Sequence, residues 1–257
     1  MAAAKGEAFY WMLSAASLSI GTIFWWLLSV MINDATLLPS PGEVIKTGGK
    51  MIASGVLAES MVASMERVII GYVAGVVLGV FTGLLLGQFK TLNDIFGPVF
   101  EFLKGIPPIA LVPMLVLWFG IGELPRYIIV AYIVWIIVMI GTYTGVREIP
   151  DIRWRAGRFM GFSPAAIMWR IILPSAMPYT LGAMRSAIGF AFIAVVSAEL
   201  IAAKSGLGFI IMDARFTSNT SQTIVGVLAL GLLGALTLWI FDFSTSRSTL
   251  ITRYARK

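Results

Sequence analysis

The sequence contains no cysteine and no histidine, and only 12% of its 257 residues are charged. Without these two residue types the chain has no disulfide, no thiolate, no imidazole metal ligand and no imidazole acid–base group. Soluble proteins carry about 25% charged residues. A chain with 12% charged and 58% apolar residues has too little polar surface to cover a globule in water. The composition therefore predicts an all-α protein that crosses a membrane several times.

Six hydrophobic stretches are long enough to span a membrane, because a hydrocarbon core of about 30 Å needs about 20 apolar residues per helix. The first is too long for the apolar part of a signal peptide and lacks a clear cleavage site, so we interpret it as a retained helix. The sequence thus predicts a single transmembrane domain over residues 1–257. The predicted spans are Phe9–Met31, Met61–Leu86, Phe96–Phe119, Tyr127–Thr144, Tyr179–Ala203 and Thr223–Phe243.

The Lys and Arg residues of the loops predict the orientation, because cytoplasmic loops carry the excess of positive charge. With both termini inside, residues 33–60 form an external loop and residues 145–178 a cytoplasmic loop. Eleven basic residues then lie inside and five outside, and this bias explains the pI of about 9.7 without nucleic-acid binding. Those inside are Lys5, Lys90, Arg147, Arg153, Arg155, Arg158, Arg170, Arg247, Arg253, Arg256 and Lys257, and those outside are Lys46, Lys50, Arg126, Lys204 and Arg215.

The second predicted span carries a glycine at every fourth position. Residues four apart share one face of a helix, so these glycines form a smooth groove that another helix can approach closely. We expect tight helix packing there, with a direct role in transport as the alternative. The glycines are Gly71, Gly75, Gly79, Gly83 and Gly87.

Four ionisable side chains lie at or near membrane depth, where charge is costly and usually faces a partner or a cavity. Glu101 and Lys104 are spaced i,i+3 and could neutralise each other, whereas Arg185 could extend to the headgroups and Glu199 could be interfacial. Pro107 and Pro108 should break the third helix. The candidate pathway residues are therefore Glu101, Lys104, Pro107, Pro108, Arg185 and Glu199.

The cytoplasmic loop has the pattern of two short helices. Asp151 suits the start of the first and Gly161 its left-handed end, while Ser163 and Pro164 suit the start of the second and Pro174 its end. Apolar side chains exposed among arginines would form a docking surface for a partner, or alternatively rest on anionic lipid. The residues expected to be exposed are Ala156, Phe159, Met160, Phe162, Ile167 and Trp169.

This loop resembles the EAA loop of ABC-importer permeases, whose pattern is Glu-Ala-Ala, three residues, Gly, nine residues, Ile, one residue, Leu-Pro. Gly157 departs from the pattern at the second alanine, and Arg155 reverses the charge of the glutamate. Phe159 lies within the same run. The residues that keep the pattern are Ala156, Gly161, Ile171, Leu173 and Pro174.

Motifs along the rest of the chain look like the nitrate/sulfonate/taurine branch of this family. They are Leu38-Pro39-Ser40-Pro41, Ile106-Pro107-Pro108, Leu117–Glu123, Ala198–Ala203 and Gly206-Leu207-Gly208-Phe209. The resemblance implies a type I importer fold in the bacterial inner membrane and a homodimer of permeases. It also implies two cytoplasmic ATPase subunits on the EAA loops, which bind ATP and Mg²⁺, and a periplasmic or lipid-anchored substrate-binding protein. No cofactor is expected in this chain.

The function that the resemblance implies is that of a non-catalytic, membrane-spanning permease subunit of an ATP-driven importer for a small anion. Taurine or another alkanesulfonate is the first choice, with nitrate, bicarbonate and aromatic carboxylates as alternatives. The chain has no Gly-x-x-x-x-Gly-Lys-Ser/Thr phosphate loop, so hydrolysis of ATP belongs to another chain. A secondary transporter or channel would leave the basic loop unexplained, and a membrane enzyme would lack convergent catalytic groups.

Overall fold

The computed structural model describes residues 2–246, and in this range the chain forms helices and no strand. A single π-helical stretch, η1, interrupts the otherwise α-helical series. The elements are α1 (Ala2–Ile32), α2 (Pro41–Ala53), α3 (Val56–Gln88), α4 (Lys90–Lys104), α5 (Pro108–Phe119), α6 (Glu123–Arg147), α7 (Asp151–Phe159), α8 (Pro164–Ile167), η1 (Met168–Ile172), α9 (Leu173–Ala202), α10 (Leu207–Phe216) and α11 (Thr220–Ser246).

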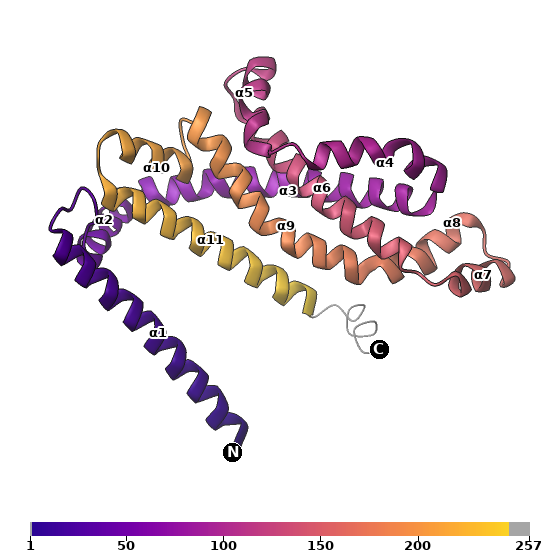
Figure 1. Cartoon of the computed structure of the whole chain (residues 1–257), viewed down its shortest axis with the longest axis horizontal. Helices are drawn as coiled ribbons and strands as arrows, with labels where there is room; N and C mark the ends of the chain where they lie inside the picture. The colour runs from indigo at the N-terminus through magenta and orange to yellow at the C-terminus, as the bar shows by residue number, and fades with distance from the viewer. Residues whose placement is uncertain (1, 247–257) are drawn as a thin grey trace.

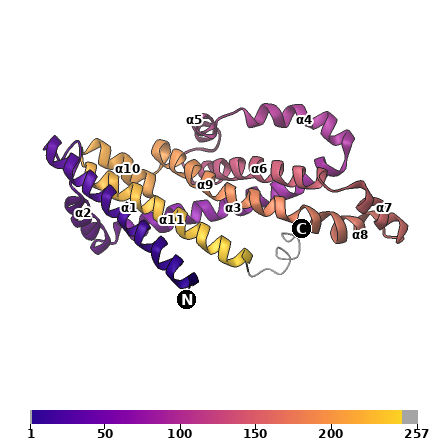
Figure 2. The same ribbon diagram turned by 60° about the horizontal axis from the view of Figure 1, so that its bottom comes forward.

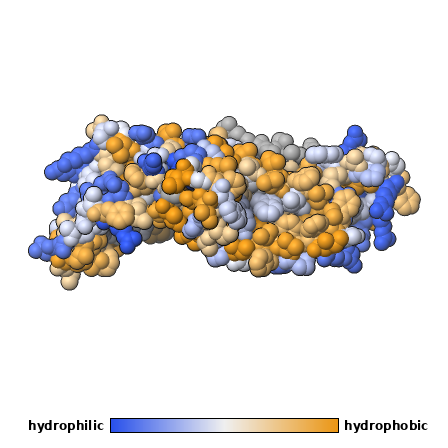
Figure 3. Space-filling model, turned by 90° about the horizontal axis from the view of Figure 1, so that it is seen from above, coloured by the Kyte–Doolittle hydropathy of each residue, from blue (hydrophilic) through white to orange (hydrophobic). Residues whose placement is uncertain are grey.

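The helices form an elongated bundle in which α3, α6 and α9 run side by side (Figures 1 and 2). The helices α2 and α10 lie at one end, and α7 and α8 lie at the other. In Figure 1, α1 diverges from the rest of the bundle. Hydrophilic residues gather at both ends of the long axis and hydrophobic ones between them (Figure 3), as expected for a protein with its middle in hydrocarbon.

The predicted spans correspond to helices, and the third of them is broken in two. Four continuous helical segments are long and apolar enough, namely Val56–Gln88, Glu123–Arg147, Pro164–Ile201 and Thr220–Ser246. The third predicted span is two helices, α4 and α5, which are bent by 96° at the break and together would make a fifth crossing. The first predicted span, Phe9–Met31, begins among residues whose side chains lie outside those that the structure describes, and the described part, Ala16–Ile32, is an apolar stretch of α1. The described residues therefore account for four or five crossings, and α1 stays the predicted further one.

The glycine face of α3 packs directly against α6, as the spacing predicts. A Cβ atom on Gly71 would lie 2.5 Å from Val130 Cβ, and one on Gly79 would lie 2.7 Å from Val138 Cβ. Gly75, Gly83 and Gly87 are equally close to α6. The facing residues of α6 also recur every four positions, so the two helices mesh without space for any further side chain. They are Val130, Val134, Val138, Thr142 and Val146.

The prediction that Pro174 ends a short helix is wrong, because the helix runs on from Pro164 to Ile201 as one segment of 38 residues. A proline inside a helix lacks its N–H and clashes with the carbonyl four residues before it. Here the preceding turn is π-helical, and the N–H of Leu173 bonds to the carbonyl of Met168, five residues earlier. The wider turn gives room for the proline ring, so the helix continues.

Candidate functional site

The two short helices α7 and α8 follow the local signals of the sequence. Asp151 occupies the first turn of α7, and Gly161 adopts the predicted left-handed conformation, with a φ of +74°. The Ser163 hydroxyl then caps α8 by accepting a hydrogen bond from the N–H of Ala166 at 3.2 Å. Pro164 follows as the first residue of α8. The predicted helix–turn–helix is confirmed, except that its second helix continues into the membrane.

One face of this tip is apolar and open. The side chain of Phe159 is 94% exposed, which is exceptional for a phenylalanine, and Ala156 beside it is exposed as well. Met160, Trp169 and Ile152 of the same tip are exposed as well. The prediction is wrong for Ile167 and Phe162, which lie against Trp154 and Ile172 in a small core of their own. These two side chains hold α7 on α8 and are not available to a partner.

The residues of the EAA pattern divide between this surface and that core. Gly157 is buried against Ile167 and Ile171, and a Cβ there would lie 2.7 Å from Ile171 Cδ1. Glycine at this position lets α7 lie close to the helix below it. Leu173 and Pro174 are half-buried. The Ile and Leu-Pro positions therefore support α7, while Arg155 and Ala156 face outward.

The other face of α7 is basic. Arg155, Arg158, Asp151 and Trp154 line a hollow of about 310 Å³, together with Gln88 at the end of α3. Three further arginines of the loop have contacts inside the chain. Arg153 donates a hydrogen bond to the Ser175 hydroxyl at 3.0 Å, and Arg147 and Arg170 lie over the rings of Tyr143 and Phe162.

The charges predicted for the pathway are paired. The Lys104 ammonium lies 2.6 Å from a Glu101 carboxylate oxygen, so the expected mutual neutralisation is confirmed. Both border a hollow of about 570 Å³ between α4 and α6. Pro107 and Pro108 begin α5 just after the bend. A role of these residues in passage of the substrate stays a prediction.

Arg185 does not simply extend toward the headgroups. Its guanidinium bonds to both oxygens of Asp242, at 2.7 and 2.9 Å, and so connects α9 with α11.

Glu199 is buried inside the protein and paired, while its depth in the membrane stays a prediction. Its side chain is 1% exposed and pairs with Arg67, which is 3% exposed, at 2.7 Å. The Ser64 hydroxyl and the backbone N–H of Gly208 also donate to the Glu199 carboxylate, at 2.8 Å each. A buried charge is tolerated only with such compensation. The pair ties α3 to α9 and to the start of α10.

The Arg67 guanidinium also forms hydrogen bonds to α6 and to the turn before α10. It donates to both oxygens of Glu123, at 2.6 and 2.9 Å, and to the backbone carbonyl and hydroxyl of Ser205, at 2.8 and 2.9 Å. Arg126 bonds to the same Glu123 carboxylate. Gly206, with a φ of +110°, leaves room for the pair, because a Cβ there would lie 2.5 Å from the Glu199 carboxylate. The sequence analysis missed this network, although opposite charges in two separate predicted spans were a usable signal.

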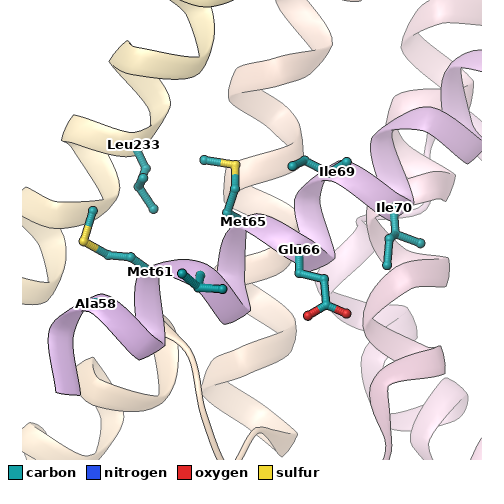
Figure 4. Close-up of a pocket in the computed structure, with 8 residues that line it drawn as sticks. Ala58, Met61, Met65, Glu66, Ile69, Ile70 and Leu233 are labelled. Atoms are coloured by element: carbon teal, nitrogen blue, oxygen red, sulfur yellow. The ribbon is translucent and has the colours of Figure 1, made fainter. Parts of the chain in front are cut away.

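An open groove runs along α3 toward Leu233 of α11 (Figure 4). It has a volume of about 590 Å³, and Met61, Met65 and Ile69 are among its apolar lining residues. Glu66 is its one charged lining residue; the carboxylate accepts a hydrogen bond from Tyr127 Oη at 3.2 Å. Lipid chains could fill such an apolar groove, so it is not evidence of a ligand site. Among the side chains that the structure describes, no group of three metal-ligating residues is found either.

Comparison with known proteins gives consistent matches. The model of the family described as "Binding-protein-dependent transport system inner membrane component" matches residues 75–249, more than half of the chain. The taurine transport system permease protein TauC of Escherichia coli K12 is 30% identical over 238 residues, covering 88% of this chain and 86% of TauC. The nitrate import permease protein NrtB of Synechocystis is 30% identical over 233 residues, covering 86% and 83%.

A solved structure of the MetNI methionine ABC transporter, in an inward-facing conformation, has the same fold. The TM-score is 0.59 over 72% of this chain and 96% of the matched chain, with 19% sequence identity.

Proposed function

Because this chain belongs to the family of binding-protein-dependent transport system inner membrane components, we propose that its cytoplasmic tip receives an ATPase that drives the import of a small organic sulfonate. The chain is the permease subunit of an ABC importer and not itself a catalyst. A secondary transporter, a channel and a membrane enzyme are thereby set aside. The ATP and Mg²⁺ would be bound by the partner ATPase.

The observation that carries the docking proposal is the exposed apolar surface at the tip of the bundle. Phe159 is 94% exposed at a position that hydrocarbon does not reach in the predicted orientation. Exposed apolar surface in water is characteristic of interaction sites. The spacing of Ala156, Gly161 and Leu173 is that of the loop on which the family seats its ATPase.

Replacing Phe159 by aspartate is expected to detach the ATPase without unfolding the permease. The side chain contacts almost nothing within the chain, whereas a central aromatic anchor of an interface is worth about 2 kcal/mol or more, or roughly 30-fold in affinity. The measurement is the amount of ATPase that co-purifies with the tagged permease. The matched control is Phe216→Asp, since Phe216 is 81% exposed but lies on α10 at the opposite end. Equal retention in both variants would contradict the proposal.

The substrate that we propose is taurine or a related alkanesulfonate, with nitrate as the alternative. The support is the 30% identity to TauC over 88% of the chain, and NrtB is similar to the same degree. We expect taurine and short alkanesulfonates to stimulate ATP hydrolysis by the reconstituted complex when its binding protein is present. Nitrate and bicarbonate serve as comparison anions, and stimulation by nitrate alone would reverse the assignment.

We propose that both termini lie in the cytoplasm and that two copies of the chain form the transmembrane unit. The excess of loop arginines supports the orientation. In Figure 1, α1 diverges from the bundle, and its exposed apolar side chains, such as Leu18 and Ile20, are available to a second copy. The chain has no cysteine of its own, so Ala53→Cys and Thr91→Cys can each be labelled against a clean background. Both side chains are exposed, at opposite ends of the bundle. An impermeant maleimide should label the first in spheroplasts and the second only after lysis; the reverse would overturn the orientation.

A further inference from the structure

The arginines of the cytoplasmic loop differ in whether they have partners. Arg153 bonds to a hydroxyl, and Arg147 and Arg170 lie over aromatic rings. Among the residues that the structure describes, Arg155 and Arg158 form no ion pair, although Asp151 lines the same hollow. These two guanidinium groups are exposed.

The two free arginines lie directly beside the apolar surface. Ile152, Ala156 and Phe159 recur at i, i+4 and i+7 on one face of α7, and Arg155 and Arg158 follow on the adjacent face. A partner that covers Phe159 must therefore approach both guanidinium groups as well. Covering an arginine without a counter-charge is strongly unfavourable, because the ion loses its hydration.

We infer that the ATPase docking on this chain presents carboxylate groups to Arg155 and Arg158, an arrangement opposite in sign to the one that the family pattern, with its glutamate, would require. This inference rests on the proposed function. Planar guanidinium groups suit bidentate contacts with carboxylates, and complementary charge mainly decides which partner is accepted. The permease would therefore accept its own ATPase and reject one built for a glutamate at position 155.

A membrane surface is the other anionic partner to consider, and the length of the helix argues against it. The continuous segment Pro164–Ile201 has 38 residues, which at 1.5 Å per residue is about 57 Å. A whole bilayer with its headgroups is about 40–45 Å thick. The tip that carries α7 therefore projects beyond the lipid, as its place at the end of the bundle indicates (Figure 1).

The experiment compares charge reversal at this surface with charge reversal elsewhere. The tagged chain is purified with the ATPase that co-elutes, as wild type, Arg155→Glu, Arg158→Glu and the control Arg215→Glu, an exposed arginine at the other end. We expect at least tenfold less ATPase with either of the first two and no change with the control. An unchanged or increased yield with Arg155→Glu would overturn the inference.

Two further measurements distinguish a charge contact with the ATPase from a contact with anionic lipid. Retention by the wild type should fall as NaCl is raised, and the Arg155→Gln/Arg158→Gln variant should lose most of this dependence, because salt screens charge pairs. The retention of the ATPase by the wild type and by Arg155→Glu is also compared in nanodiscs of phosphatidylcholine and of phosphatidylglycerol. An effect of Arg155→Glu confined to phosphatidylglycerol would show that lipid is the partner and overturn the inference. Absence of any ATPase from the wild-type eluate would instead contradict the proposed function itself.

Discussion

Gly79→Leu is expected to lower the melting temperature of the permease strongly. A Cβ at position 79 would already lie 2.7 Å from Val138 Cβ and 2.9 Å from the carbonyl oxygen of Trp135. A leucine must therefore push α3 and α6 apart along their shared face. Overpacking typically costs about 1–3 kcal/mol and sometimes more, and the rigid backbone on both sides places this case at the upper end. The measurement is thermal unfolding in detergent, followed by size-exclusion chromatography.

The matched control is Gly231→Leu in α11. A Cβ there would meet nothing within 4 Å, so the same change of residue type leaves the packing alone. Gly79→Ala should fall between the two, since it adds the clashing atom but nothing beyond it. A melting temperature of Gly79→Leu equal to that of Gly231→Leu would show that the two helices separate without cost.

Arg67→Met should be nearly as damaging, because it leaves the Glu199 carboxylate buried without its cation. Removing one partner of a buried ion pair costs about 3–5 kcal/mol. Glu123 would also lose two hydrogen bonds, although it keeps Arg126. The free energy of unfolding can be measured by denaturant titration in mixed micelles. Arg215→Met, which removes an exposed arginine from α10, provides the comparison.

The double variant Arg67→Met/Glu199→Gln tests whether charge is the cause. The glutamine keeps acceptor and donor atoms near the Ser64 hydroxyl and the Gly208 N–H but carries no charge. Its loss of stability should be smaller than that of Arg67→Met alone, which is the non-additivity expected of directly interacting residues. The single variant Glu199→Gln completes the comparison. If the stability losses of Arg67→Met and Glu199→Gln simply add in the double variant, then packing and not the ion pair stabilises this end of the bundle.

The features predictable from the sequence are those set by helix geometry within one segment. The spacing from Gly71 to Gly87 identifies a common face, because 3.6 residues per turn holds in any α-helix, and the capping residues around Gly161 act within a few positions. The partnership of Arg67 with Glu199 joins positions far apart in the chain, and no periodicity indicates which helices meet or in what register.

The prediction that Pro174 ends a helix was wrong for a related reason. The local rule treats a proline as the end of a helix, whereas here one π-helical turn accommodates it and the helix continues. The exposure of Ile167 was misjudged because the close approach of α7 at Gly157 depends on how the short helices fold back on each other.

The continuous helical segment from Pro164 to Ile201 connects the two ends of the bundle. Glu199, in the ion pair with Arg67, lies near one end of this segment, and the tip that we propose as the docking site of the ATPase lies at the other. From Pro164 to Glu199 the segment is about 50 Å long, so a tilt of roughly 5° about one end displaces the other by about 4 Å. That displacement exceeds the reach of a hydrogen bond. A small tilt of this segment, driven from the tip, would therefore be enough to separate Glu199 from Arg67 at the opposite end of the bundle.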